Sequence, residues 1–344
     1  MHMADALISP AVGGTMWVAS TGLLAWCARK VRQTLDDKII PLMGVLGAFI
    51  FAAQMINFSI PGTGSSGHLG GGMILAILLG PAAAFLVIAS VLTVQALFFA
   101  DGGLLALGCN IFNLGVFPAF IAYPLIYKPI VGNAQGGHRL RAGAMLAGIV
   151  GLQMGAFSVV METTMSGISD LPFKTFVWLM QPIHLAIGVV EGVVTAAVVS
   201  LVMRVRPEAL PERQPAGHDA GGLRRVVIGL LIAAVAVGGG LSWFASTRPD
   251  GLEWSMAKVS GKEKRESPAA GIHESAAEIQ QKTAFLPDYG FKSAKPVVAT
   301  TEPAPKEPAP WPAVSAGSSV AGLVGGLMTL LLAGLIGYGL KRRA

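Results

Sequence analysis

The stretch Phe176–Met203 has the sequence FVWLMQPIHLAIGVVEGVVTAAVVSLVM and decides the class of fold. A helix crosses the hydrocarbon core of a bilayer with about 20 mostly apolar residues. This stretch is longer than that and is interrupted by a single carboxylate, Glu191. The whole chain of 344 residues is 53% hydrophobic and 13% charged, whereas soluble domains carry about 25% charged residues. The sequence therefore predicts an all-α integral membrane protein.

Further apolar runs predict a bundle of about seven transmembrane helices, followed by a two-helix transmembrane hairpin. The other long runs of the bundle are Ala11–Ala28, Ile39–Asn57, Ala82–Ala100, Leu104–Tyr127 and Ala142–Met161. The run His68–Leu79 is too short to cross upright, so we expect a half-helix packed inside the protein, where broken backbone is tolerated. The hairpin comprises Val226–Ala245 and Val320–Leu340.

Positive charges predict the orientation of these helices. Lys and Arg gather in the segments 29–38, 128–141 and 204–213, which share one side only if His68–Leu79 counts as a crossing. Cytoplasmic loops carry an excess of Lys and Arg, so we expect a multi-pass protein of the bacterial inner (plasma) membrane, with its N-terminus and His68 outside. Basic residues at both ends of the hairpin place the C-terminus in the cytoplasm. The net charge of +6 needs no nucleic-acid partner.

Composition shifts divide the chain into three parts. Residues 1–206 form a membrane domain, and residues 207–223, rich in Pro, Gly and charge, are predicted to be a cytoplasmic linker. Residues 224–344 form the hairpin module, with an extracytoplasmic loop over 246–312. Within that loop we expect local order at 250–255 and an extended or disordered segment at 301–310.

The start of the chain, Met1-His2-Met3, predicts a metal chelate. The amine of Met1, the backbone nitrogen of His2 after loss of its proton, and the His2 ring Nδ1 can close two fused rings on one metal ion. His68, in a Gly- and Ser-rich loop expected on the same side of the membrane, can supply a fourth nitrogen. Four nitrogens in a plane suit Ni(II), Co(II) or Cu(II) rather than Ca(II) or Mg(II). The alternative is a frayed end with an incidental histidine.

Other polar residues lie in or near the predicted spans. Ligating histidines usually need an outer partner that fixes the ring, and the candidates for this second shell are Gln54, Asn57, Ser66, Gln95 and Asn110. His184 and Glu191 lie seven residues apart on one face of a span. An ionised group at mid-membrane costs on the order of 2.5–3.5 kcal/mol, so we expect a structural hydrogen-bond role for this pair, with a proton or metal relay as the alternative.

Two other functions remain open from the residues alone. Gly64-Ser65-Ser66-Gly67 has the short G-x-S-G pattern of intramembrane serine proteases, in which Ser66 would pair with His184. A metal-responsive membrane sensor is the other alternative. The chain contains neither H-E-x-x-H nor G-x-x-x-x-G-K-[ST], which argues against a membrane zinc protease and against ATP binding by this chain.

Four stretches resemble the CbiM/NikM substrate-capture (S) components of energy-coupling-factor (ECF) nickel and cobalt transporters. They are residues 1–10, 48–58, 65–71 and 94–110, and the resemblance covers about the first 205 residues. Cys109 stands where the family usually has alanine. The sequence Pro249-Asp250-Gly251-Leu252-Glu253 resembles the NikN-type accessory subunits. The chain is thus similar to a NikMN fusion.

This resemblance implies a transport component that is not itself an enzyme. It implies metal binding by Met1, His2 and His68, with Ni(II) or Co(II) as the transported substrate and no permanent cofactor. It also implies partners besides the metal ion and the membrane lipid: ECF ATPase subunits and a transmembrane coupling protein, of the NikO/NikQ or CbiO/CbiQ type. ATP hydrolysis is then expected in a separate subunit.

Overall fold

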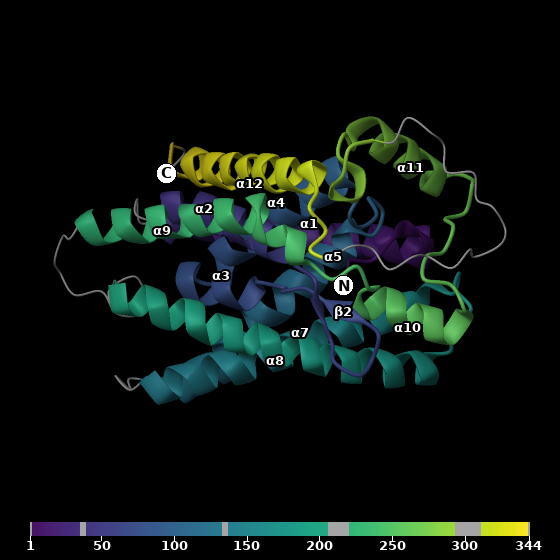
Figure 1. Ribbon diagram of the computed structural model, residues 1–344, viewed down its shortest axis with the longest axis horizontal. Coiled ribbons are helices and arrows are strands. Elements are labelled where there is room, and N and C mark those ends of the chain that lie inside the picture. Colours follow the sequence, from purple (N-terminus) through teal and green to yellow (C-terminus); the bar gives the residue numbers. More distant parts are fainter. Residues whose placement is uncertain (1, 35–38, 133–136, 206–219, 293–310, 343–344) are drawn as a thin grey trace.

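The computed structural model describes residues 2–34, 39–132, 137–205, 220–292 and 311–342. Within these ranges the protein is a helical bundle with one two-stranded antiparallel sheet, formed by β1 (Phe58–Ser59) and β2 (Ser66–Gly67). The long helices run side by side along the longest axis of the molecule (Figure 1). The predicted fold class is confirmed.

The first part of the chain supplies most of the bundle. Its helices are η1 (Asp5–Leu7), α1 (Pro10–Thr34), α2 (Ile39–Gln54), α3 (Gly72–Leu79), α4 (Pro81–Phe99), α5 (Leu107–Val116), η2 (Phe117–Tyr127), α6 (Lys128–Val131), α7 (Gly137–Ser166) and α8 (Phe173–Val205). Each residue of α3 is buried, as expected of a half-helix enclosed by protein. The π-helical geometry of η2 has a local cause, because Pro118 and Pro124 each remove a backbone donor from the helical ladder.

The second part adds the hairpin and the segment between its helices. Its elements are α9 (Ala220–Gly239), η4 (Leu241–Phe244), α10 (Gly251–Ser260), α11 (Ile272–Thr283), η5 (Pro287–Tyr289) and α12 (Ala316–Arg342). The local order expected at 250–255 is found in α10, whose N-terminus carries a capping box between Asp250 and Glu253. The predicted linker over 207–219 and the segment 301–310 lie outside the described residues.

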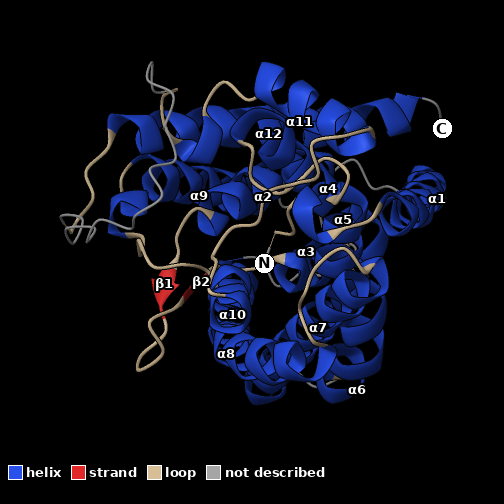
Figure 2. Ribbon diagram, turned by 90° about the vertical axis from the view of Figure 1, so that its right-hand side faces the viewer, coloured by secondary structure: helices blue, strands red, loops and turns tan. Residues whose placement is uncertain are grey.

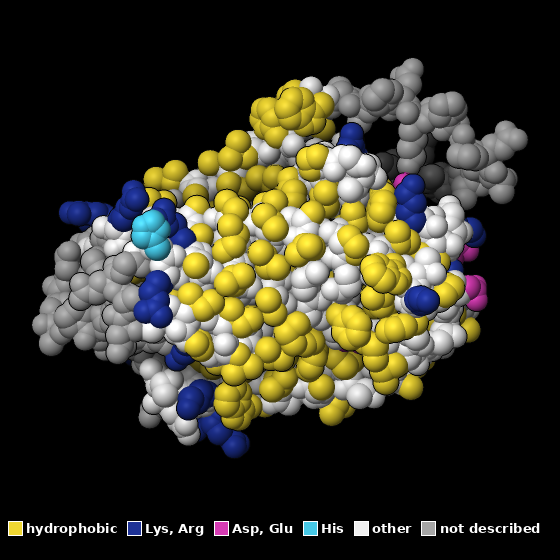
Figure 3. Space-filling model, turned by 90° about the horizontal axis from the view of Figure 1, so that it is seen from below, with side chains coloured by type: hydrophobic (Ala, Val, Ile, Leu, Met, Phe, Trp, Pro, Cys, Tyr) yellow, Lys and Arg dark blue, Asp and Glu magenta, His cyan; other side chains and the backbone are white. Residues whose placement is uncertain are grey.

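Seven helices of the described chain are long and apolar enough to cross a membrane. Five belong to the first part, two are α9 and α12, and α2 is a shorter apolar helix. Figure 3 shows a band of hydrophobic side chains across the middle of one face, with Lys and Arg at both ends but more of them at the left, and Asp and Glu visible only toward the right. The protein is therefore a multi-pass membrane protein.

The hairpin packs against α2 rather than standing apart from the bundle. A Cβ atom added to Gly44 would lie 2.8 Å from the carbonyl oxygen of Leu330, so glycine allows α2 and α12 to approach closely. Viewed along the bundle, α9, α12 and α2 lie together in the upper half of the picture, whereas α10 lies beside β2 and α8 in the lower half (Figure 2). The two parts of the chain therefore meet both within the bundle and at the end of it where β2 and α10 lie.

Candidate metal centre

The N-terminal segment is held in an extended conformation by the start of α5. Asn110 binds the backbone of Met3 twice: its Oδ1 accepts from Met3 N at 2.8 Å, and its Nδ2 donates to Met3 O at 3.1 Å. Asp5 lies two residues on, and its Oδ1 accepts from the backbone nitrogen of Ala106 at 2.9 Å. Burial raises the pKa of Asp5 above its ordinary value. These contacts fix the backbone that carries His2.

The ring of His2 is oriented by the outer ends of two elements. Its Nδ1 lies 2.8 Å from Oδ1 of Asp101, just after α4. The other oxygen of Asp101 accepts a hydrogen bond of 2.5 Å from the hydroxyl of Tyr289 in η5. Burial raises the pKa of Asp101, but the charge and hydrogen bond of His2 outweigh this effect and leave the pKa below its usual range. Burial and the Asp101 charge raise the pKa of Tyr289.

The loop that carries His68 is held by one buried carboxylate. Glu191 of α8 accepts from the backbone nitrogens of Gly70 at 2.8 Å and Gly71 at 3.0 Å. On the other side of the loop, Nε2 of Gln54 donates to the carbonyl of Gly70 at 2.8 Å. Gln95 in turn donates to Oε1 of Gln54 at 2.8 Å. The loop is therefore clamped between α8 and the pair α2 and α4.

These supports bring the two predicted histidine ligands together. The ring centroids of His2 and His68 lie 4.9 Å apart, with an angle of 36° between the ring planes. Nδ1 of His68 lies 3.0 Å from the carbonyl of Leu69, and Nε2 of His2 is buried without a hydrogen-bond partner. Met1, the third predicted contributor, lies outside the described residues. Among the described residues, no three His, Cys, Asp or Glu side chains form a metal-binding group.

One feature differs from the planar chelate that the sequence predicts. The chelate needs Nδ1 of His2, and in the structure this nitrogen is hydrogen-bonded to Asp101. The fused rings can form only if Nδ1 leaves the carboxylate. Asp101 is therefore positioned either to take up a proton displaced from the ring or to steer the ring away from the chelate.

The hairpin module covers this site. Its loop is bonded to the His68 loop, since Ser66 N donates to Pro249 O at 2.8 Å and Trp254 Nε1 donates to Thr63 O at 3.0 Å. A cavity of about 480 Å³ opens above the two histidines. It is lined by side chains from both parts of the chain, among them His2, His68, Asp101, Asp250, Glu253, Glu263, Lys264, Arg265, Asp288 and Tyr289. Five carboxylates against two cationic side chains make the lining of this cavity favourable for cations.

The expected second shell supports the backbone more than the rings. Gln54, Gln95 and Asn110 hold the two loops as described above. The side-chain oxygen of Asn57 is buried without a hydrogen-bond partner, and its carbonyl accepts from Ser246 N at 2.7 Å. The side chains that sequence reasoning missed are Asp101 and Tyr289. In the sequence they are only a carboxylate at the end of a predicted helix and a tyrosine far along the chain. Without the fold, such residues look like ordinary exposed polar residues.

The protease alternative lacks its Ser–His pair. The hydroxyl of Ser66 donates to the carbonyl of Arg248 at 2.8 Å. Nδ1 of His184 lies 2.8 Å from the carbonyl of Met180, one turn earlier in α8. No hydrogen bond joins Ser66 to His184 in the described part of the chain, so the arrangement needed to activate the serine is absent there. The structural role expected of Glu191 is found, but its partners are the glycines after His68 rather than His184.

Comparison with known proteins agrees with this geometry. The profile of the family described as the cobalt uptake substrate-specific transmembrane region matches residues 2–209, and that of the PDGLE domain matches residues 224–342. The putative fused nickel transport protein NikMN of Archaeoglobus fulgidus is 35% identical over 233 residues, which cover 68% of this chain and 74% of that protein. The fused nickel transport protein NikMN of Rhodobacter capsulatus is 31% identical over 312 residues, 84% of this chain and 88% of that protein.

A solved structure extends the agreement to the fold. The crystal structure of a truncated transition metal transporter matches with a TM-score of 0.53 and 30% identity, over 59% of this chain and 99% of that one. The bundle, the outer site and these relatives define a membrane transport protein for transition metal ions. The chain belongs to the CbiM family and is a nickel/cobalt transport component of the CbiM/NikMN type.

Proposed function

We propose that the chain is the metal-capturing S component of an ATP-driven ECF-type importer for Ni(II), with Co(II) as the alternative ion. The observation that carries this proposal is the approach of the His2 and His68 rings, 4.9 Å apart beneath a cavity rich in carboxylates. The Met1 amine, the His2 backbone nitrogen and ring, and the His68 ring would then give four nitrogens in a plane, a geometry that suits Ni(II).

In this proposal the ion enters from outside through the cavity, and the hairpin module forms part of the entrance. Residues 1–206 capture the ion, 207–223 link the modules and 224–344 assist loading or opening. ATP is hydrolysed by separate ATPase subunits, and a transmembrane coupling protein transmits the change. The protein lies in the bacterial inner membrane with its N-terminus outside and its C-terminus in the cytoplasm, as the basic segments 29–38, 128–141 and 204–213 favour.

The first test is an absorption titration with Ni(II). Purified protein with its native N-terminus is compared with a version that has a long flexible extension before Met1 and with His2→Ala. A yellow band of planar type is expected in the native protein only, because the extension turns the Met1 amine into a peptide nitrogen and His2→Ala removes the ring nitrogen. Equal spectra in the three proteins would contradict the N-terminal chelate.

Acid should weaken binding steeply, because the amine, the amide and the imidazoles must all lose protons to bind the metal. Accumulation of nickel in cells that carry the chain and its partners separates transport from sensing. Metal binding without accumulation would favour the sensor.

A further inference from the structure

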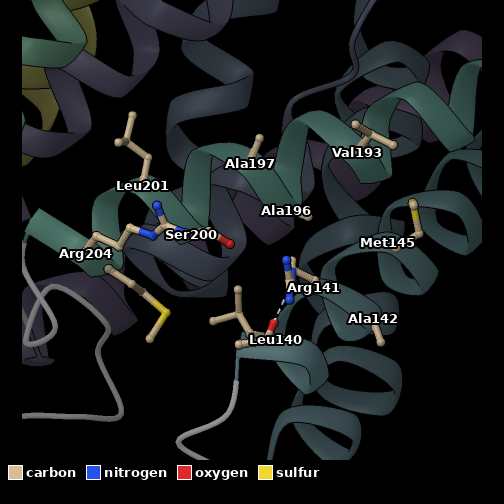
Figure 4. A pocket seen from close by; sticks show the side chains of 12 residues that line it. Leu140, Arg141, Ala142, Met145, Val193, Ala196, Ala197, Ser200, Leu201 and Arg204 are labelled. Carbon is tan, nitrogen blue, oxygen red and sulfur yellow. Dashed lines mark hydrogen bonds between the residues drawn. The ribbon is translucent and has the colours of Figure 1, made fainter.

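A second hollow, which the two histidines do not line, lies between α7 and α8 near the start of α7 and the end of α8 (Figure 4). It has a volume of about 910 Å³. Its lining is mostly apolar and includes Leu140, Met145, Val193, Ala197 and Leu201. The value lies within the range of about 300–1,000 Å³ that is usual for small-molecule sites.

Helix packing explains why this hollow exists. Nearer the middle of the bundle, α7 and α8 are in close contact, since a Cβ atom added to Gly192 would lie 2.8 Å from the carbonyl oxygen of Met145. One turn further toward the end of α8, the facing side chains are small, with Ala142 on α7 and Ala196 and Ala197 on α8. These short side chains leave a slot between the helices. On its outer side Leu201 and Val193 are 64% and 49% exposed, as expected of a face turned to lipid chains.

The polar groups of the slot are suited to an anion. Arg141 on α7 and Arg204 and Ser200 on α8 line it, and its described lining contains no carboxylate. Figure 4 shows Ser200 between the two arginines, which come from opposite helices. The guanidinium of Arg141 is oriented by a hydrogen bond of 3.1 Å from its Nε to the carbonyl of Gly137. Both arginines are exposed.

From this arrangement we propose that the slot binds one anionic phospholipid. Its phosphate accepts from Arg141, Arg204 and Ser200, and an acyl chain lies along Val193, Ala197 and Leu201. Basic pockets between transmembrane helices on the cytoplasmic side bind anionic headgroups, and the charges here lie at the end of an apolar slot that opens to the membrane. A zwitterionic phospholipid would satisfy the apolar walls and offer a phosphate, but its ammonium group cancels that charge and leaves the two arginines without a net counter-charge.

The test uses the full chain in a non-ionic detergent, with phosphatidylglycerol or phosphatidylcholine added in equal amounts, and native mass spectrometry counts the retained lipid. Each arginine near an anionic membrane surface contributes about 1 kcal/mol, so R141Q/R204Q should weaken phosphatidylglycerol retention about 30-fold. Phosphatidylcholine retention should be weaker at the start and should fall less, because its net charge is zero. R141K/R204K keeps both charges and should retain most of the binding.

Two further variants separate the slot from general charge and folding effects. R32Q/R225Q removes two exposed basic residues outside the slot and should leave retention unchanged. Ala197→Trp fills the slot while both arginines remain, and should lower retention of phosphatidylglycerol. Equal retention of both lipids by the unmodified chain would overturn the proposal. The same would follow if R32Q/R225Q lost as much phosphatidylglycerol as R141Q/R204Q. Full displacement by inorganic phosphate, which indicates a free-anion site, would also overturn it. Unchanged lipid retention in R141Q/R204Q with loss of a co-purifying coupling protein would assign the slot to that protein instead.

Discussion

The two histidines of the proposed metal site are held in place by different contacts. The segment of His2 is held by the neutral amide of Asn110 and by the side chains of Asp101 and Tyr289, the second of which belongs to the hairpin module. The loop of His68 is held from below by the carboxylate of Glu191, which is buried in α8. Both segments have several supports, but Glu191 alone accepts from two backbone N–H groups of the His68 loop, whereas Asn110 accepts from only one of the His2 segment. Loss of Glu191 should therefore displace its loop more than loss of any single support displaces His2.

The largest effect is therefore expected from Glu191→Ala. Each backbone N–H left buried without a partner costs about 1–3 kcal/mol, and this substitution leaves those of Gly70 and Gly71. Loss of an outer-shell partner typically lowers metal affinity 10–100-fold, and we expect the upper end of that range. The measurement is the dissociation constant for Ni(II) from the absorption titration. Glu191→Gln keeps a side-chain oxygen that can accept from one N–H. Its Ni(II) affinity should therefore lie between that of the unmodified protein and that of Glu191→Ala.

Glu162 provides the matched control for this prediction. It is another buried carboxylate in a span, but its Oε2 accepts from the side chain of Asn113 at 2.7 Å rather than from a backbone N–H of a ligand loop, and Asn113 reaches the N-terminal segment only through a long contact of 3.8 Å with Sδ of Met3. Glu162→Ala should lower thermal stability with less than about a 3-fold change in Ni(II) affinity, far below the outer-shell range. Equal loss of affinity in both alanine variants would show that general destabilisation, not the clamp, lowers the affinity.

The sequence predicts the transmembrane helices around this site better than the hydrogen bonds that hold its two histidine segments. Hydropathy identifies the spans because the bilayer sets their length, and the basic loops place His2 and His68 on one side. The contacts that hold them join Gly70 to Glu191 and Tyr289 to Asp101, pairs separated by 121 and 188 residues. Such pairings depend on how whole helices pack. The sequence indicates which polar residues are buried, but it does not indicate which backbone group each one meets.

A smaller effect is expected from Asn110→Leu, on the His2 side. The substitution preserves the size of the side chain and leaves Met3 N without its acceptor, while Met3 O keeps the bond of 2.9 Å from Gly103 N. One buried donor is orphaned rather than two, so we expect about a 10-fold loss of Ni(II) affinity in the same titration. Asn57→Ala is the control of the same residue type, because its side-chain oxygen has no hydrogen-bond partner. An Asn57→Ala loss as large as that of Asn110→Leu would contradict the assigned role of Asn110.

The smallest effect, and the one that tests the contribution of the hairpin module, is expected from Tyr289→Phe. The phenol oxygen donates to Asp101, which in turn binds the His2 ring, so the change removes one hydrogen bond to a charged group two steps from the metal. Such a bond contributes about 1.5–3 kcal/mol to the stability of the pair. Only part of this free energy changes metal binding, so we expect about a 3- to 10-fold change in Ni(II) affinity.

The direction of the change in affinity shows which role Asp101 has. A lower affinity would mean that the Tyr289–Asp101 pair keeps the His2 ring beside His68 before the metal binds. A higher affinity would mean that the Tyr289–Asp101 pair holds Nδ1 away from the metal. The hairpin module, which supplies Tyr289, would then lower the affinity for the metal ion.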